Sequence, residues 1–134
     1  MSGILQGRTA IVTGAGGGLG AAHARVFASE GCAVVVNDIN TEAAQAVVDS
    51  ITAAGGRAIV NSSDITHYDD SPNAVKQAID SFGGLDIVLN NAGINRDRMF
   101  ASMTEAEWDA IMAVHLKGHF CISSHAVHYW RGLS

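Results

Sequence analysis

The stretch TAIVTGAGGGLG, residues 9–20, decides how this chain folds. Its first five residues, Thr9 to Thr13, are typical of a short buried strand, and five of the next seven residues are glycine. A helix is expected to follow from about Leu19 to Glu30, because apolar residues recur there at helical spacing. A turn with so few side chains lets a bulky anion come close, and the helix points its free N–H groups at that anion. The stretch therefore predicts a diphosphate-binding loop.

The rest of the chain alternates strands and helices. Further strands are expected at residues 32–37, 58–62 and 85–89, and further helices at residues 42–54, 71–82 and 105 to near 130. Strand–helix repeats joined by short turns form right-handed crossovers and a parallel sheet. We therefore expect an α/β fold: a single Rossmann-type, doubly wound domain over residues 1–134, formed by the first four strands of such a sheet and their helices.

Capping residues mark the expected helix starts. Asn40 or Thr41 is suited to cap the second helix, and Ser71 is expected to cap the third, with proline directly after it. Thr104 and Glu107 have the spacing of a capping box for the long last helix.

The composition indicates a globular protein of the cytoplasm. With 48% hydrophobic residues and one proline, the chain has the material for a core and little tendency to disorder. A formal net charge of −5 gives no general attraction to nucleic acid or to an anionic membrane. No apolar run reaches the roughly 18 residues of a membrane span, and no secretory signal pattern is present. Cys32 and Cys121 are expected to be reduced, buried thiols.

Polar residues follow three of the expected strands at the end where ligands of parallel sheets bind. Asp38 follows the second strand, Asp64 the third, and Asn90-Asn91-Ala92-Gly93 the fourth. These stretches should meet the glycine turn in one crevice. Asp38 is placed to accept hydrogen bonds from both hydroxyls of an adenosine ribose and to repel the extra phosphate of NADP, so the sequence favours NAD. The alternatives are a tight turn without a ligand and a solvated acid at a strand end.

The pattern Thr13-Gly14-x-x-x-Gly18-x-Gly20, together with Asn90-Asn91-Ala92-Gly93, resembles the short-chain dehydrogenase/reductase family. The resemblance extends to about Arg131. It implies that Thr13 and Asn90 tie the glycine turn to the fourth strand. It also implies a set of residues that contact the cofactor NAD: Gly14, Gly16, Gly17, Gly18, Leu19, Gly20, Asp38, Asp64, Ile65, Asn91, Ala92, Gly93 and Val114.

Two segments narrow the resemblance within that family. Residues 91–98 and 114–118 look like the dehydrogenase part of peroxisomal multifunctional enzymes, which oxidise 3-hydroxyacyl-CoA and have relatives that act on hydroxysteroids. This implies an NAD-dependent oxidoreductase that moves a hydride between a secondary alcohol or ketone and nicotinamide. The run Gly93-Ile94-x-Arg96-Asp97 also resembles 3-oxoacyl-carrier-protein reductases. Those usually prefer NADP, so Asp38 weighs against them.

His115 is the candidate catalytic residue. It stands where much of the family has an asparagine that helps to order a water and the catalytic lysine, and the alternative is a histidine packed on a helix face. His119, His125 and His128 follow on the same expected helix. No carboxylate or cysteine completes a ligand set with them, and we expect no metal site.

The serine and the Tyr-x-x-x-Lys pair on which family catalysis rests have no match in this sequence. Tyr68 is followed at the fourth position by proline, and Tyr129 by leucine. Ser123 and Ser124 lie in the long helix, whereas the family's serine belongs to a later strand. We therefore expect these 134 residues alone to be inactive. The alternatives are a truncated, non-catalytic NAD-binding fragment and a nucleotide-binding regulatory module of another family.

The last expected strand and helix should leave apolar surface exposed. Residues 85–89 should form an uncovered apolar edge, and Trp108, Phe120 and Trp130 should be exposed. By the family resemblance, the whole enzyme should take a small-molecule substrate and form a homo-oligomer through the long C-terminal helix.

Overall fold

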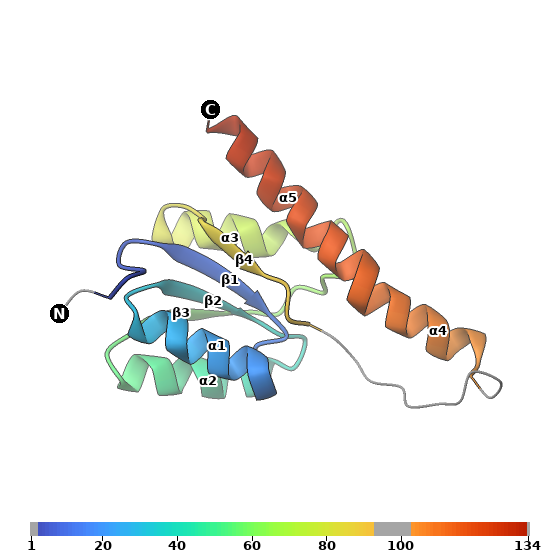
Figure 1. The fold of residues 1–134 in the computed structure, drawn as a ribbon, viewed down its shortest axis with the longest axis horizontal. Coiled ribbons are helices and arrows are strands. Elements are labelled where there is room, and N and C mark those ends of the chain that lie inside the picture. Colours follow the sequence, from blue (N-terminus) through green and yellow to red (C-terminus); the bar gives the residue numbers. More distant parts are fainter. Residues whose placement is uncertain (1–2, 93–102, 134) are drawn as a thin grey trace.

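The computed structural model describes residues 3–92 and 103–133. Within them, four parallel strands form a single sheet in the order β3-β2-β1-β4 (Figure 1). The strands are β1 (Thr9–Thr13), β2 (Ala33–Asn37), β3 (Arg57–Asn61) and β4 (Ile87–Leu89). β4 is two residues shorter than expected and lies at one edge of the sheet. The strand order is that of a doubly wound nucleotide-binding sheet, so the predicted α/β fold is confirmed.

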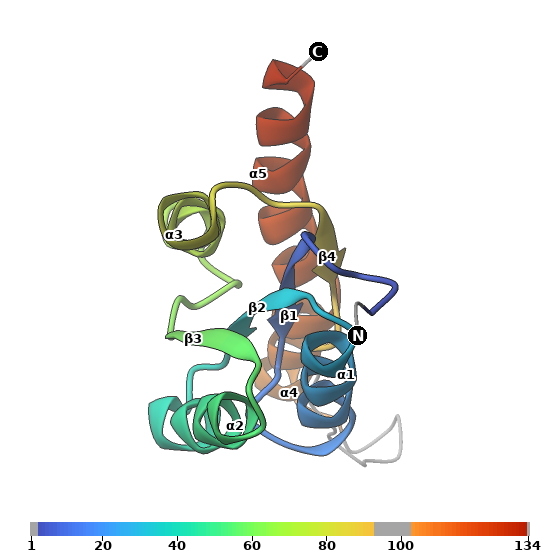
Figure 2. The same ribbon diagram turned by 90° about the vertical axis from the view of Figure 1, so that its left-hand side faces the viewer.

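Helices cover both faces of the sheet. α1 (Gly18–Ser29) and α2 (Thr41–Ala53) lie on one face, and α3 (Pro72–Phe82) and α5 (Gly118–Gly132) lie on the other (Figure 2). α4 (Glu105–Met112) continues into α5 and projects beyond the sheet (Figure 1). In the described part of the chain, no helix is long and apolar enough to cross a membrane.

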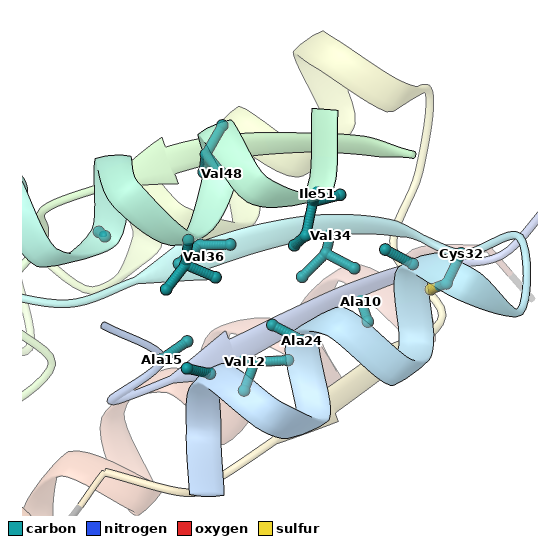
Figure 3. Packing of buried hydrophobic residues seen from close by; sticks show 13 residues of the cluster. Ala10, Val12, Ala15, Ala24, Cys32, Val34, Val36, Val48 and Ile51 are labelled. Atoms are coloured by element: carbon teal, nitrogen blue, oxygen red, sulfur yellow. The ribbon is translucent and has the colours of Figure 1, made fainter. Parts of the chain in front are cut away.

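Alternate side chains of the central strands enter two separate cores. Val12, Val34 and Val36 pack against α1 and α2 (Figure 3), whereas Ile11 and Val35 pack against α3 and α5. All five side chains have no exposed surface. Burying each one contributes about 1.5–3 kcal/mol. Because both faces are covered, these strands have continuous apolar sequences instead of alternating ones.

Two of the three predicted caps are confirmed. The side chains of Asn40 and Thr104 each accept a hydrogen bond from the backbone N–H three residues on, both at 3.1 Å. The prediction for Ser71 is wrong. Its backbone is already helical (φ −61°, ψ −29°), and its hydroxyl donates backwards to the carbonyl of Tyr68 at 3.2 Å. An N-cap side chain needs extended backbone to reach the helix N–H groups, and Ser71 lacks it.

The long last helix is not the uniform α-helix that the sequence predicts. A π-helical turn, η2 (Ala113–Lys117), separates α4 from α5. Directly after it, Gly118 packs so closely that an added Cβ would lie 3.0 Å from Cδ1 of Ile65. Apolar spacing over one turn does not distinguish an α-helix from a π-helix, so the sequence pattern missed this change.

The two tryptophans differ in how exposed they are. Trp108 is 50% exposed and Phe120 61% exposed, as expected. Trp130 is half-buried, and its indole N–H donates to the carbonyl of Leu85 at 2.7 Å, so the expectation of an exposed Trp130 is wrong. The reason is that α5 lies against the segment leading into β4, and this contact covers the ring.

Candidate nucleotide-binding site

The glycine turn packs against the end of β4. Gly14 has φ +62°, which favours glycine, and an added Cβ there would lie 2.7 Å from Cα of Ala92. At Gly20, in the first turn of α1, a Cβ would run into the carbonyl oxygen of Gly14 and the side-chain amide of Asn91. At Gly17 a Cβ would meet nothing within 4 Å. The turn is therefore tightly packed on its protein side and open on the other.

The start of α1 faces this open side. Gly17 is its N-cap, and the first turn of the helix carries no acidic residue. The first N–H groups of a helix lack intrahelical partners, and the helix dipole places partial positive charge there. The geometry suits a phosphate group or another anion.

Asp38 holds the glycine turn from the side of β2. One carboxylate oxygen accepts a hydrogen bond from the N–H of Gly16, and the other accepts one from the N–H of Asn40, both at 2.9 Å. A Cβ on Gly16 would lie 2.7 Å from this carboxylate. A carboxylate can accept about four hydrogen bonds, so Asp38 can still accept others from the cleft that it lines.

Thr13 joins the turn after β4 to β1. Its hydroxyl has no exposed surface and accepts hydrogen bonds from the backbone N–H groups of Asn91 (3.1 Å) and Ala92 (3.0 Å). It also faces the carbonyl of Leu89 at 3.5 Å. One side chain thereby satisfies two backbone donors at the point where the strand ends.

The two asparagines after β4 have different partners. The side chain of Asn91 donates to the carbonyl of Gly14 at 3.2 Å. Asn90 was expected to make this connection, and that expectation is wrong: its amide donates to Oγ of Ser123 on α5 at 3.0 Å. Successive side chains at a strand end point to opposite faces, so only one of the pair can reach the glycine turn.

Asp64 is fixed in a hydrogen-bonded turn after β3. One carboxylate oxygen accepts from the N–H (2.9 Å) and the hydroxyl (2.6 Å) of Thr66, and the other lies 3.3 Å from Nε2 of His67. Burial raises the pKa of Asp64, but the Thr66 hydrogen bonds and the nearby His67 and Lys117 outweigh burial and leave the pKa below its ordinary value. Asp64 is therefore a stable anion at neutral pH.

These elements enclose a cleft of about 460 Å³ at the carboxyl ends of the strands. Its volume lies within the range of about 300–1,000 Å³ that is typical of small-molecule and cofactor sites. Eight of the predicted cofactor residues line it: Gly14, Gly17, Asp38, Asp64, Ile65, Asn91, Ala92 and Val114. The structure thus brings the four separate sequence stretches together in one crevice.

The other predicted site residues lie elsewhere. Gly16, Gly18 and Gly20 belong to the turn and to the start of α1 but do not line the cleft, and Leu19 is 72% exposed. Gly93 lies outside the described residues. His115 is exposed in η2, next to Val114.

Four lining residues were missed by the sequence reasoning: Asn37, Ile39, Ser63 and Thr66. Each is one or two residues from a predicted acid. Their position in the sequence could have identified them, because every residue around the carboxyl end of a parallel strand is a candidate for the crevice. Asn37 and Ser63 are buried polar residues, which the sequence did not indicate.

Two histidines of α5 contact the backbone. Nε2 of His119 lies 3.2 Å from the carbonyl oxygen of Ala92, and Nε2 of His125 lies 2.9 Å from that of Tyr68. Across residues 3–92 and 103–133, no group of three or more His, Cys, Asp and Glu side chains is arranged to hold a metal ion.

The fold and the glycine turn together define a class of protein. The family model described as short chain dehydrogenase matches residues 8–132, and the chain belongs to the short-chain dehydrogenase family.

Among its relatives is the hydroxyacyl-CoA dehydrogenase ChsB1 of Mycobacterium tuberculosis, 47% identical over 132 residues, which cover 95% of this chain and 41% of ChsB1. The peroxisomal multifunctional enzyme type 2 of Mus musculus is 43% identical, over 88% of this chain and 17% of the enzyme. The crystal structure of a short chain dehydrogenase from Mycobacterium avium matches with a TM-score of 0.94 and 53% identity, over 98% of this chain and 48% of the other. The chain therefore spans less than half the length of each of these relatives.

Proposed function

We propose that this chain binds NAD in the cleft at the carboxyl ends of β1 to β4. The observation that carries the proposal is the position of Asp38: it borders the cleft, and its carboxylate also holds the N–H of Gly16 in the glycine turn. A diphosphate would lie on the open side of the turn at the start of α1, and the hydroxyls of the adenosine ribose would donate to Asp38. The same carboxylate would repel the 2′-phosphate of NADP.

The remaining lining residues fit the rest of the nucleotide. Asp64 and Ile65 would meet the adenine, and Asn91 and Ala92 would form the floor of the cleft. When bound, NAD supplies the site that accepts or donates a hydride. Residues 1–134 would bind the nucleotide and fix its orientation.

The reaction that we propose for the whole enzyme is hydride transfer between NAD and a secondary alcohol or ketone. The substrate class is a 3-hydroxyacyl thioester or a hydroxysteroid, by analogy with the hydroxyacyl-CoA dehydrogenase among the relatives. His115 would assist from η2. Proton transfer in this family needs the serine, tyrosine and lysine for which the sequence has no match, so we expect residues 1–134 to bind NAD without turnover.

A titration of the purified protein with NAD and NADP tests the proposal. We expect NAD to bind more tightly than NADP, and Asp38→Ala to weaken NAD and reduce the preference over NADP. Asp80→Ala, which removes an exposed acid from α3, is the matched control and should change neither affinity. If Asp38→Ala bound both nucleotides as the parent does, the ribose assignment would be wrong.

We further propose a cytoplasmic protein that forms homo-oligomers through the last helix. A shallow depression on that helix is lined by the apolar residues Met112, Ala113, Leu116 and Phe120 and by the charged residues Asp109 and Lys117. Leu116 is 66% exposed and Phe120 61%. Exposed apolar side chains grouped in this way are typical of a contact surface. Sedimentation velocity measures the association, and a strictly monomeric protein at micromolar concentration would contradict it.

A further inference from the structure

Three buried polar residues, two of which line the cleft, gather at the carboxyl ends of β2 and β3. Asn37 is 3% exposed, Asn61 6% and Ser63 7%. Asn37 and Asn61 are paired in register across the two strands, on the face covered by α3. Buried amides are costly unless their donors and acceptors are satisfied, so their partners show what this arrangement holds in place.

The partners form a continuous chain of hydrogen bonds from the cleft to α3. Nδ2 of Asn37 donates to Oδ1 of Asn61 (2.7 Å) and to the carbonyl of Ser63 (3.1 Å). Oδ1 of Asn61 also accepts from the N–H of Ser63 at 3.1 Å. On its other side, Nδ2 of Asn61 donates to Oε1 of Gln77 at 2.8 Å, and Nε2 of Gln77 donates to the carbonyl of Val60 at 2.8 Å.

Both backbone polar groups of Ser63 are thus held by side chains instead of by a neighbouring strand. β3 ends at Asn61, and the chain then turns so that Ser63, Asp64 and Ile65 line the cleft. Asn37, the last residue of β2, lines the cleft directly before Asp38. The amide pair therefore sets the distance between the two loops that border one side of the crevice.

We propose that Asn61 is a positioning residue for the adenosine half of the nucleotide. Asn61 does not line the cleft; it acts by fixing Ser63 to Ile65 against Asn37 and Asp38. This inference rests on the proposed NAD site. Gln77 has a different role in this inference. Its amide joins Asn61 to α3 and, among the described contacts, makes no hydrogen bond to either of the two loops that border the cleft.

The difference between Asn61 and Gln77 provides a matched test. Asn61→Leu removes the acceptor that holds Asn37 and Ser63, whereas Gln77→Leu removes only the connection to α3. Both variants should lower the melting temperature. In calorimetric titration, Asn61→Leu should raise the Kd of NAD about tenfold, the equivalent of one net hydrogen bond. The Kd of ADP-ribose, which lacks nicotinamide, should rise by the same factor. Gln77→Leu should leave both values within about twofold of the parent.

A second variant keeps the test decisive if Asn61→Leu does not fold. Asn61→Thr suits a strand and retains one acceptor, so it should give a smaller rise in the Kd of ADP-ribose. Unchanged ADP-ribose affinity in these Asn61 variants would overturn the inference, and so would an equal loss in Gln77→Leu. A parent protein that binds neither NAD nor ADP-ribose would overturn the proposed function, and the inference with it.

Discussion

Replacing Thr13 by valine tests the connection between β1 and the turn after β4. Valine has nearly the shape of threonine, so the core around this fully buried position stays filled. The hydroxyl that accepts from the N–H groups of Asn91 and Ala92 is lost. Leaving a buried donor unsatisfied costs about 1–3 kcal/mol. The two N–H groups are only partly buried, and we expect a total loss of about 2–4 kcal/mol in the free energy of unfolding.

Thr13→Ser is the matched control, because it keeps the hydroxyl and removes one methyl group. The lost apolar burial should cost about 1 kcal/mol. Urea denaturation, followed by tryptophan fluorescence, measures both variants against the parent. Trp130 is a suitable reporter because its indole is half-buried and hydrogen-bonded to Leu85 in the folded state. The proposed role of the hydroxyl is refuted if Thr13→Val is at least as stable as Thr13→Ser, since the hydroxyl would then contribute no more than the methyl group.

The remaining predictions concern the glycine turn and Asp64. Gly20→Ala places a methyl group against backbone and should destabilise the protein by about 1–3 kcal/mol in urea denaturation. Gly17→Ala, whose Cβ meets nothing within 4 Å, should cost less, because it has only the lower preference of alanine for the N-cap to overcome; equal effects would contradict this packing argument. Because the pKa of Asp64 is lowered in the folded state, its carboxylate stabilises the protein above its ordinary pKa, and this contribution is lost as the pH falls through the folded pKa. Thr66→Val removes one of the hydrogen bonds that lower this pKa. The melting temperature of the variant should therefore lie below the parent's at pH 7, and the difference between the two should narrow toward about pH 3. A difference that does not depend on pH would argue against this role.

The sequence predicted the architecture because the relevant signals are local. The glycine turn follows a strand of five buried residues and precedes a helix, and that order alone specifies a crossover to a parallel neighbour. Asp38, Asp64 and Asn91 were also predictable as crevice residues, since the carboxyl ends of parallel strands meet at one edge.

What the sequence did not predict depends on side-chain direction and on partners far along the chain. Asn90 and Asn91 are adjacent and chemically identical, yet one bonds Ser123 and the other Gly14. The π-helical turn before Gly118 cannot be recognised from the spacing of apolar residues, because it is only five residues long. The amide pair of Asn37 and Asn61 forms only when β2 and β3 align, and neither residue belongs to a recognisable motif.

The double attachment of Asp38 has a consequence for anyone who wishes to redesign the nucleotide preference that we propose for this protein. Replacing Asp38 by alanine to admit a 2′-phosphate also removes the acceptors of the N–H groups of Gly16 and Asn40, so this one substitution changes both recognition and loop anchoring. A successful redesign needs a second substitution that supplies a new acceptor to the glycine turn.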